Sequence, residues 1–112
     1  MIVVEDEALV AMLLEDMLLD LGCTVVSVAG NIQDALANAA DAIADGAVLD
    51  VNIAGEKVFP VADALARRGM PFVFATGYGP AGIDEQYPGA PVLAKPYSAD
   101  ALAKALLSFR KN

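Results

Sequence analysis

Short hydrophobic runs alternate with longer amphipathic segments along the whole chain. Runs rich in valine and alanine, each as long as a β-strand, occur at residues 1–4, 24–28, 46–49, 71–75 and 91–94. Apolar residues recur at helical spacing between and after these runs, in residues 7–21, 31–44, 57–68 and 99–110. The pattern therefore predicts strands and helices in alternation, with the last helix capped by Ser98.

Two of the predicted helices have an apolar face that can be named from the spacing alone. In the first helix, the four-residue spacing selects Leu9, Leu13, Met17 and Leu21. In the second helix, the predicted face consists of Leu36, Ala39, Ala40 and Ile43. We expect both faces to pack against the sheet.

Strands that alternate with helices and are hydrophobic throughout are typical of a parallel sheet buried on both faces. The economical arrangement is a doubly wound α/β fold with a five-stranded parallel sheet, flavodoxin-like in its strand order 2-1-3-4-5. Residues 77–89 contain glycine or proline at six positions, so a fourth helix is expected to be weak or absent. With 112 residues and no internal repeat or linker, we expect one domain spanning residues 1–112.

The composition narrows the classes of function. Fifteen acidic and seven basic residues give a net charge of −8, which disfavours direct binding to nucleic acid or to an anionic membrane. The longest apolar stretch, residues 8–14, is far shorter than the roughly 20 residues of a membrane span. Acidic residues at 5–7 argue against a secretory signal, and a cytoplasmic location is expected. The lack of histidine disfavours most catalytic triads and zinc sites.

Polar side chains stand where the predicted strands end. Glu5 and Asp6 follow the first strand, Asp50 the third, Thr76 the fourth and Lys95 the fifth. In an open parallel sheet, ligands bind beyond the carboxyl ends of the strands. The sequence therefore predicts that these residues share one edge of the sheet.

Three carboxylates at one edge call for a cation. Each pair of charges a few ångströms apart would repel by about 4 kcal/mol in a partly buried site. Oxygen ligands without histidine or cysteine favour a hard ion, and Mg²⁺ fits best. A carboxylate facing such an ion can attack phosphorus, and we expect Asp50 to be this nucleophile. Lys95 and Thr76 are suited to contact phosphoryl oxygens.

These residues belong to a series of motifs that strongly resembles the receiver domain of two-component response regulators. The motifs are VVEDE at residues 3–7, LDVN at 49–52, AT at 75–76 and AKP at 94–96, and the resemblance covers nearly the whole chain. It implies that Asp50 accepts a phosphoryl group from a histidine of a sensor kinase or phosphotransfer protein. Thr76 would move toward that group, and Lys95 would pair with it.

The resemblance also implies a magnesium site. Asp6, Asp50 and the backbone carbonyl of Asn52 would bind Mg²⁺, and Glu5 would assist through water. The domain would then act as a Mg²⁺-dependent switch that takes up a phosphoryl group, loses it by hydrolysis and signals by contact with a downstream protein. It would not be an enzyme acting on external substrates.

A narrower resemblance concerns residues 49–78, which are similar to the FATGUY branch of single-domain receivers. This branch occurs in alphaproteobacteria and is associated with general stress signalling. Val92 stands where many receivers carry a switch aromatic on the last strand, and we expect Tyr78 to substitute for it.

Three alternatives remain open from the sequence. The chain could be a receiver taken from a hybrid kinase or a longer regulator. An aspartyl phosphatase of the haloacid dehalogenase type would want a second aspartate as general acid, and Asn52 stands at that position. A flavodoxin-like module that binds a small ligand would need a phosphate-binding loop, which is absent after the first strand.

Overall fold

The computed structural model describes residues 1–77, 87, 91–95 and 98–111. The strands are β1 (Ile2–Val4), β2 (Ser27–Ala29), β3 (Ala47–Asp50), β4 (Asn52–Ile53), β5 (Glu56–Lys57), β6 (Phe72–Thr76) and β7 (Val92–Ala94). The helices are α1 (Ala8–Asp20), α2 (Ile32–Asp41), α3 (Phe59–Arg67), α5 (Ala99–Leu107) and the 3₁₀ helix η1 (Ser108–Lys111). In the part of the chain described, no helix is long and apolar enough to span a membrane.

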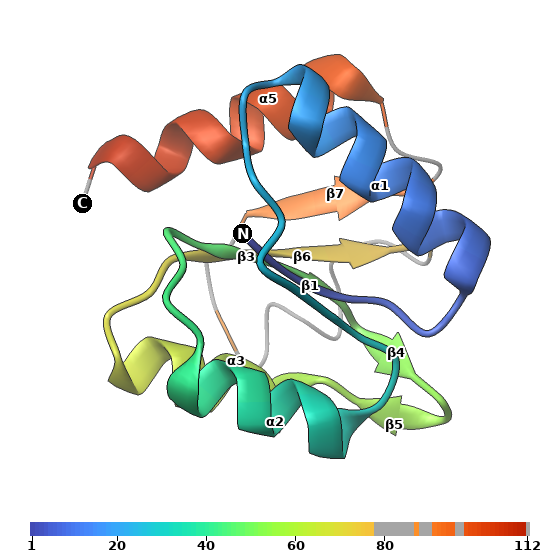
Figure 1. Ribbon diagram of the computed structural model, residues 1–112, viewed down its shortest axis with the longest axis vertical. Helices are drawn as coiled ribbons and strands as arrows, with labels where there is room; N and C mark the ends of the chain where they lie inside the picture. The colour runs from blue at the N-terminus through green and yellow to red at the C-terminus, as the bar shows by residue number, and fades with distance from the viewer. Residues whose placement is uncertain (78–86, 88–90, 96–97, 112) are drawn as a thin grey trace.

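Five strands form one parallel sheet in the order β2-β1-β3-β6-β7. Numbered along the chain within this sheet, the order is 2-1-3-4-5, so the predicted flavodoxin-like arrangement is confirmed. Helices α1 and α5 cover one face of the sheet, and α2 and α3 cover the other (Figure 1). The weak fourth helix and the role of Tyr78, both predicted above, lie outside the described residues.

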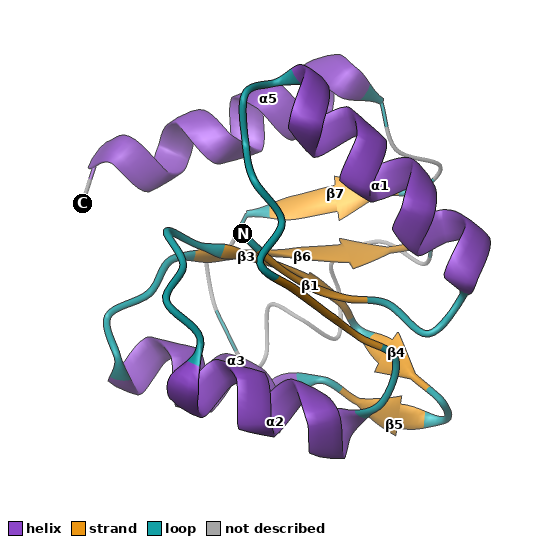
Figure 2. Ribbon diagram, viewed as in Figure 1, coloured by secondary structure: helices purple, strands orange, loops and turns teal. Residues whose placement is uncertain are grey.

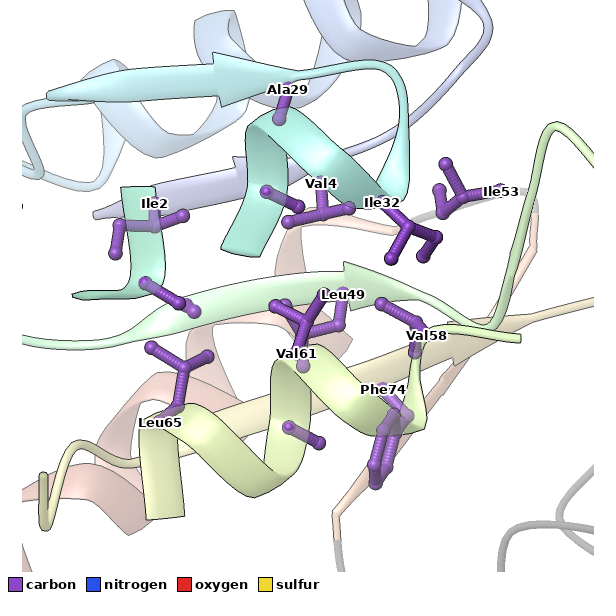
Figure 3. Close-up of a cluster of buried hydrophobic side chains, with 14 of the residues drawn as sticks. Ile2, Val4, Ala29, Ile32, Leu49, Ile53, Val58, Val61, Leu65 and Phe74 are labelled. Carbon is purple, nitrogen blue, oxygen red and sulfur yellow. The ribbon is translucent and has the colours of Figure 1, made fainter. Parts of the chain in front are cut away.

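Two hydrophobic clusters fill the space between the sheet and its helices. Alternate residues of a strand point to opposite faces, so Val4 and Leu49 pack toward α2 and α3, whereas Val3 and Val48 pack toward α1 and α5. Figure 3 shows the first of these clusters, which includes Phe74. This burial on both faces explains why the strands are hydrophobic throughout.

The buried face of α1 differs from the predicted one. The residues that face the sheet are Ala11, Leu14 and Leu18, while Leu9 and Leu13 are 81% and 51% exposed. A helix turns about 100° per residue, so a four-residue series drifts around the axis, whereas steps of three and four together stay on one face. The correction leaves several large apolar side chains of α1 on the surface, including Met12 and Leu19.

The predicted face of α2 is also only partly correct. Ile32, Ala35 and Ala39 are buried, whereas Leu36 and Ala40, which we expected to pack inward, are exposed. The helix ends at Asp41 instead of residue 44, so Ile43 lies beyond it and is 91% exposed.

Arg68 caps the end of α2. Its guanidinium donates hydrogen bonds to the carbonyls of Ala39 and Ala42, at 2.6 Å and 2.8 Å. These bonds satisfy carbonyls that the last turn of a helix leaves without partners. The contact also joins α2 to the end of α3.

A short antiparallel hairpin, β4–β5, occupies residues 52–57 directly after β3 (Figure 2). We predicted that a helix begins at residue 57, but α3 begins at Phe59 because the hairpin takes up the preceding residues. Pro60 fits the first turn of α3, where no backbone N–H is needed. The final predicted helix is divided into α5 and η1, and Ser98 caps it by accepting a hydrogen bond from the Ala101 amide at 3.1 Å.

Candidate phosphoacceptor and metal site

The parallel sheet brings the predicted polar residues to one edge. Glu5 directly follows β1, Asp50 and Thr76 end β3 and β6, and Lys95 follows β7. Glu5, Asp50 and Thr76 are buried, with 2%, 6% and 6% of their surface exposed. Polar side chains this deeply buried need partners, and each of the two carboxylates has one.

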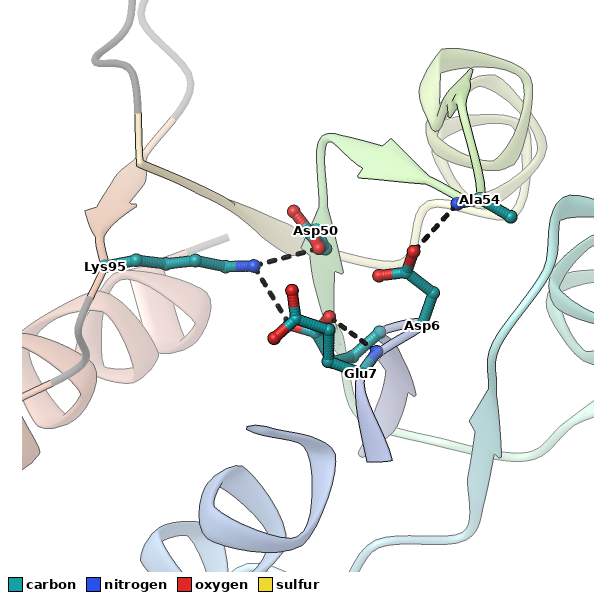
Figure 4. A network of polar contacts seen from close by, with 6 residues as sticks. Asp6, Glu7, Asp50, Ala54 and Lys95 are labelled. Carbon is teal, nitrogen blue, oxygen red and sulfur yellow. Dashed lines mark hydrogen bonds and ion pairs between the residues drawn. The ribbon is translucent and has the colours of Figure 1, made fainter. Parts of the chain in front are cut away.

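Lys95 bridges the two buried carboxylates. Its Nζ lies 3.0 Å from Oε1 of Glu5 and 2.9 Å from Oδ2 of Asp50 (Figure 4). Its backbone N–H donates to the carbonyl of Thr76 at 3.1 Å, which fixes the end of β7 against the end of β6. The ammonium group is therefore held inside the pocket by its own strand.

Glu5, Asp6 and Asp50 together form a cluster of oxygen ligands. One carboxylate oxygen from each residue lies within 4.8 Å of the others. With Lys95 as the ammonium group bound to two of them, the four side chains carry a net charge of −2 when all are ionised (−3 + 1). A hard divalent cation fits both the charge and the donor set.

The surroundings shift the proton affinities of two carboxyl groups in opposite directions. Burial raises the pKa of Glu5, although the Glu7 amide, at 3.1 Å, and Lys95 oppose this shift. The backbone N–H of Ala54 donates to Asp6 Oδ2 at 2.9 Å, and this hydrogen bond lowers the pKa of Asp6. Asp6 is thus held in its anionic form, which is the form that binds a metal ion.

Asn52 lies two residues beyond Asp50, on the hairpin. Its side chain is half-buried, and its Oδ1 accepts a hydrogen bond from Lys57 Nζ at 2.7 Å. Asn52 and Lys57 are also paired across β4 and β5. These contacts hold Asn52 in a fixed position close to Asp50, the nucleophile that we predicted.

Comparison with solved structures identifies the family. The solution structure of SdrG from Sphingomonas melonis Fr1 is 47% identical to this chain, with a TM-score of 0.86, and the match covers 97% of this chain and 93% of that one. The chain belongs to the response regulator receiver domains.

Two further structures place this receiver domain among its relatives. The BeF3-activated conformation of SdrG from Pseudomonas melonis Fr1 is 46% identical, with a TM-score of 0.81, and the match covers 96% of this chain and 92% of that one. The receiver domain of the PhyR response regulator from Erythrobacter litoralis has the same fold at 22% identity, with a TM-score of 0.86 over 98% of this chain and 88% of that one. No protein-family model and no curated protein matches the sequence.

The sequence-based prediction missed the part of this receiver domain that contacts Asp6. The Ala54 amide and the Lys57 ammonium both come from the β4–β5 hairpin, which we had not predicted. One signal was present, because Gly55 lies in a short polar interruption between Ile53 and Val58, where a tight turn is favoured. Six residues are too few for the alternation of a strand pair to stand out.

Proposed function

We propose that this receiver domain takes a phosphoryl group onto Asp50 from a phosphohistidine of a sensor kinase or phosphotransfer protein, in a reaction that requires Mg²⁺. The observation that carries the proposal is the position of Asp50, buried at the end of β3 between the Lys95 ammonium and the carboxylates of Glu5 and Asp6. A carboxylate so placed is desolvated and next to a cation, as phosphoryl transfer requires.

The transfer forms one bond and breaks one. A carboxylate oxygen of Asp50 attacks phosphorus, the P–N bond of the phosphohistidine breaks, and its electron pair stays on the imidazole nitrogen, which takes up a proton from solvent water. Lys95, already 2.9 Å from Asp50 Oδ2, stabilises negative charge on the transferred phosphoryl oxygens. We assign to Thr76, which is buried at the end of the neighbouring strand β6, the role of donating its hydroxyl hydrogen to the same group. Mg²⁺, when bound, neutralises charge on those oxygens.

The carboxylates of Glu5 and Asp6 and the carbonyl of Asn52 are the groups we assign to Mg²⁺, together with Asp50. The donor set favours this ion, because all of these ligands are oxygens and three of them carry charge. Glu5 is the most deeply buried and is bound to Lys95, so we assign it an indirect contact through water.

Loss of the phosphoryl group proceeds by hydrolysis. Water attacks phosphorus, the acyl phosphate bond breaks, and inorganic phosphate leaves while Asp50 regains its carboxylate. The carboxamide of Asn52 is not acidic enough to protonate a leaving group, so the residue argues against an aspartyl phosphatase that turns over external esters. Hydrolysis therefore returns the domain to its starting state, and the phosphorylated form acts through a changed surface.

The domain receives its phosphoryl group and passes on its signal through protein contacts, and α1 offers a surface for the phosphodonor. The outer face of α1 carries Leu9, Met12 and Leu13, which are 81%, 60% and 51% exposed, with Asp16 among them. This helix begins two residues after Asp6, so its first turn lies next to the phosphoacceptor pocket. We assign this face to a partner helix with an apolar stripe flanked by Lys or Arg, as a kinase or phosphotransfer protein could offer. General stress signalling in the cytoplasm is the role that the FATGUY-like segment, residues 49–78, supports.

A test of this function uses acetyl phosphate as phosphodonor and the intact mass as readout. In the presence of Mg²⁺ the wild-type chain should gain about 80 Da, the mass of one phosphoryl group. The gain should vanish when Mg²⁺ is removed with a chelator. Asp50→Asn should show no gain, because the amide keeps the shape but removes the nucleophile.

Asp45→Asn is the matched control. Asp45 is exposed and precedes β3. Its replacement by asparagine is the same chemical change, made at the opposite end of the strand that carries Asp50. This variant should gain the same mass as the wild type. An equal gain in Asp50→Asn would place the phosphoryl group on another residue and would overturn the proposal.

A further inference from the structure

The β4–β5 hairpin is attached to the acidic pocket by one hydrogen bond and is closed by another. The Ala54 amide in its turn donates to Oδ2 of Asp6, 48 residues earlier in the chain, at 2.9 Å (Figure 4). On the hairpin itself, Lys57 Nζ binds Asn52 Oδ1 at 2.7 Å. One contact orients an acidic side chain of the pocket, and the other closes the hairpin that makes this contact.

The turn adopts a backbone conformation that is costly for its residues. Ala54 and Gly55 both have positive φ, +50° and +84°, which is the pattern of a type I′ turn. Of the two residues, Ala54 bears the larger cost, because an L side chain is disfavoured in the left-handed region and glycine has none. The conformation points the Ala54 N–H at the Asp6 carboxylate, so the unusual φ and the contact belong together.

Asp6 has particular need of such a contact. It is exposed, whereas Glu5 and Asp50 are buried and are held by Lys95. An exposed aspartate without a partner samples several rotamers and loses that freedom when it binds an ion. A fixed N–H donor removes part of this loss in advance, while the second carboxylate oxygen remains available to a cation.

We propose that the Ala54–Gly55 turn is a positioning element that orients the Asp6 carboxylate, and thereby sets the affinity of the pocket for Mg²⁺. The inference rests on the Mg²⁺ site of the proposed function. It goes beyond that function because it assigns control of the site to a hairpin that supplies no charged ligand from its turn.

A matched pair of variants isolates the turn. Gly55→Ala and Gly69→Ala each place a methyl group at a positive φ, +84° and +72°, and in both cases the new Cβ has no atom within 4 Å. The two changes therefore carry a similar backbone cost. Only Gly55 belongs to the turn that contacts Asp6, because Gly69 follows the end of α3.

The measurement is the Mg²⁺ dissociation constant of each protein, obtained by titration with MgCl₂ and followed through the backbone amide signals. Gly55→Ala should raise this constant about fivefold, because a smaller fraction of the molecules has the turn formed. Gly69→Ala should leave it at the wild-type value. Both variants should lose similar thermal stability, so stability does not account for the difference.

A second measurement tests the same contact without requiring that Gly55→Ala folds. In metal-free wild-type protein the Ala54 amide should be protected from hydrogen exchange, and Asp6→Ala should speed its exchange about tenfold while leaving the β3 amides unchanged. Equal exchange in the two proteins would show that the contact does not form in solution, and would overturn the inference.

The titration also separates the two proposals. If the wild-type protein binds Mg²⁺ and both glycine variants bind it with the wild-type dissociation constant, the positioning role is overturned. The Mg²⁺ site of the proposed function then remains in place. Equal weakening in both variants would also overturn it, because the effect would then follow from stability. If wild-type protein binds no Mg²⁺, both the metal site and the inference fail.

Discussion

At the scale of single residues, the pocket holds neighbouring carboxylates in a buried environment where water does not solvate them fully. Glu5 is buried and its pKa is raised, first by desolvation and further by the neighbouring charge of Asp50. A folded state that holds a proton more tightly than the unfolded chain is favoured at low pH, and this contribution is lost as the pH rises through the folded pKa. Metal-free protein should therefore lose stability through Glu5 above its ordinary pKa of 4.5.

Glu5→Gln tests this account of the buried carboxyl group. Without Mg²⁺, the variant should unfold at a higher denaturant concentration than the wild type at pH 7, by about 1 kcal/mol, because a neutral side chain replaces a desolvated charge. At pH 4 the difference should shrink toward zero, since Glu5 is then largely protonated. A variant that is less stable than the wild type at pH 7 would contradict the prediction.

Lys95 offsets the charge of the pocket, and its removal should have two opposite effects. Lys95→Met leaves three carboxylates without the ammonium that now bridges two of them, so Mg²⁺ should bind at least about threefold more tightly. Phosphorylation by acetyl phosphate should nevertheless become slower, because the transferred oxygens lose a cationic partner. Titration and intact mass measure the two effects separately, and weaker Mg²⁺ binding would show that Lys95 supports the metal site.

At the scale of elements, the alternation of strands and helices was enough to predict the parallel sheet, whereas its order followed from choosing a flavodoxin-like arrangement, because alternation alone fits more than one order. The polar residues at the strand ends were also predictable, because parallel strands deliver their carboxyl ends to one edge. The face of α1 was not, because its leucines are too numerous to mark one side: Leu14 packs inward and Leu13 points to solvent. The Asp6–Ala54 contact was not predictable either, since no local spacing relates residues 48 positions apart.

The exposed leucines of α1 provide a prediction for the docking surface. Replacing Leu9 and Leu13 together by serine should change the unfolding free energy by less than about 0.5 kcal/mol each, because both side chains already face solvent. Phosphorylation by acetyl phosphate should be unchanged, while transfer from a phosphohistidine protein should slow at least about tenfold.

Ile43→Ser is the control for this surface. Ile43 is 91% exposed and follows α2, which covers the opposite face of the sheet from α1. This variant should accept phosphoryl groups from the protein donor at the wild-type rate. Equal slowing in both variants would show that the effect does not belong to α1.

Tyr87 joins α3 to the sheet and gives the fold a dependence on alkaline pH. Its ring lies 5.4 Å from that of Phe74 and 6.0 Å from that of Phe59, and its hydroxyl donates to Asp63. Burial, together with the Asp63 carboxylate, raises the pKa of Tyr87 to about 12 from 10.0. Because the unfolded chain releases this proton first, the contribution to stability is lost as the pH rises from 10.0 to about 12.

Tyr87→Phe should abolish this alkaline dependence. The difference between the ultraviolet titrations of wild type and variant should show one phenol with a pKa of about 12. The stability difference between the two proteins, measured by denaturant unfolding, should decrease over the same interval. A phenol that titrates near 10 in the difference curve would mean that Tyr87 is neither buried nor in contact with Asp63 in solution.

At the scale of the whole molecule, the charge and the topology both single out the carboxyl edge of the sheet. The chain carries a net charge of −8, of which the four side chains of the pocket contribute −2 at the carboxyl edge of the sheet. Such a field attracts divalent cations and basic protein surfaces and repels nucleic acid. The β4–β5 hairpin and the first turn of α1 lie at this same edge (Figure 2), so the proposed ion binding, phosphoryl transfer and partner contact would take place side by side.

The central claim is that Asp50 is the residue that carries the phosphoryl group, and reductive trapping tests it at the level of one residue. Protein treated with Mg²⁺ and acetyl phosphate is reduced with borohydride, which converts an aspartyl phosphate to homoserine, and is then digested and sequenced by mass spectrometry. Our account predicts a residue about 14 Da lighter than aspartate at position 50, dependent on Mg²⁺. Homoserine at any other aspartate, with residue 50 unchanged, would contradict it.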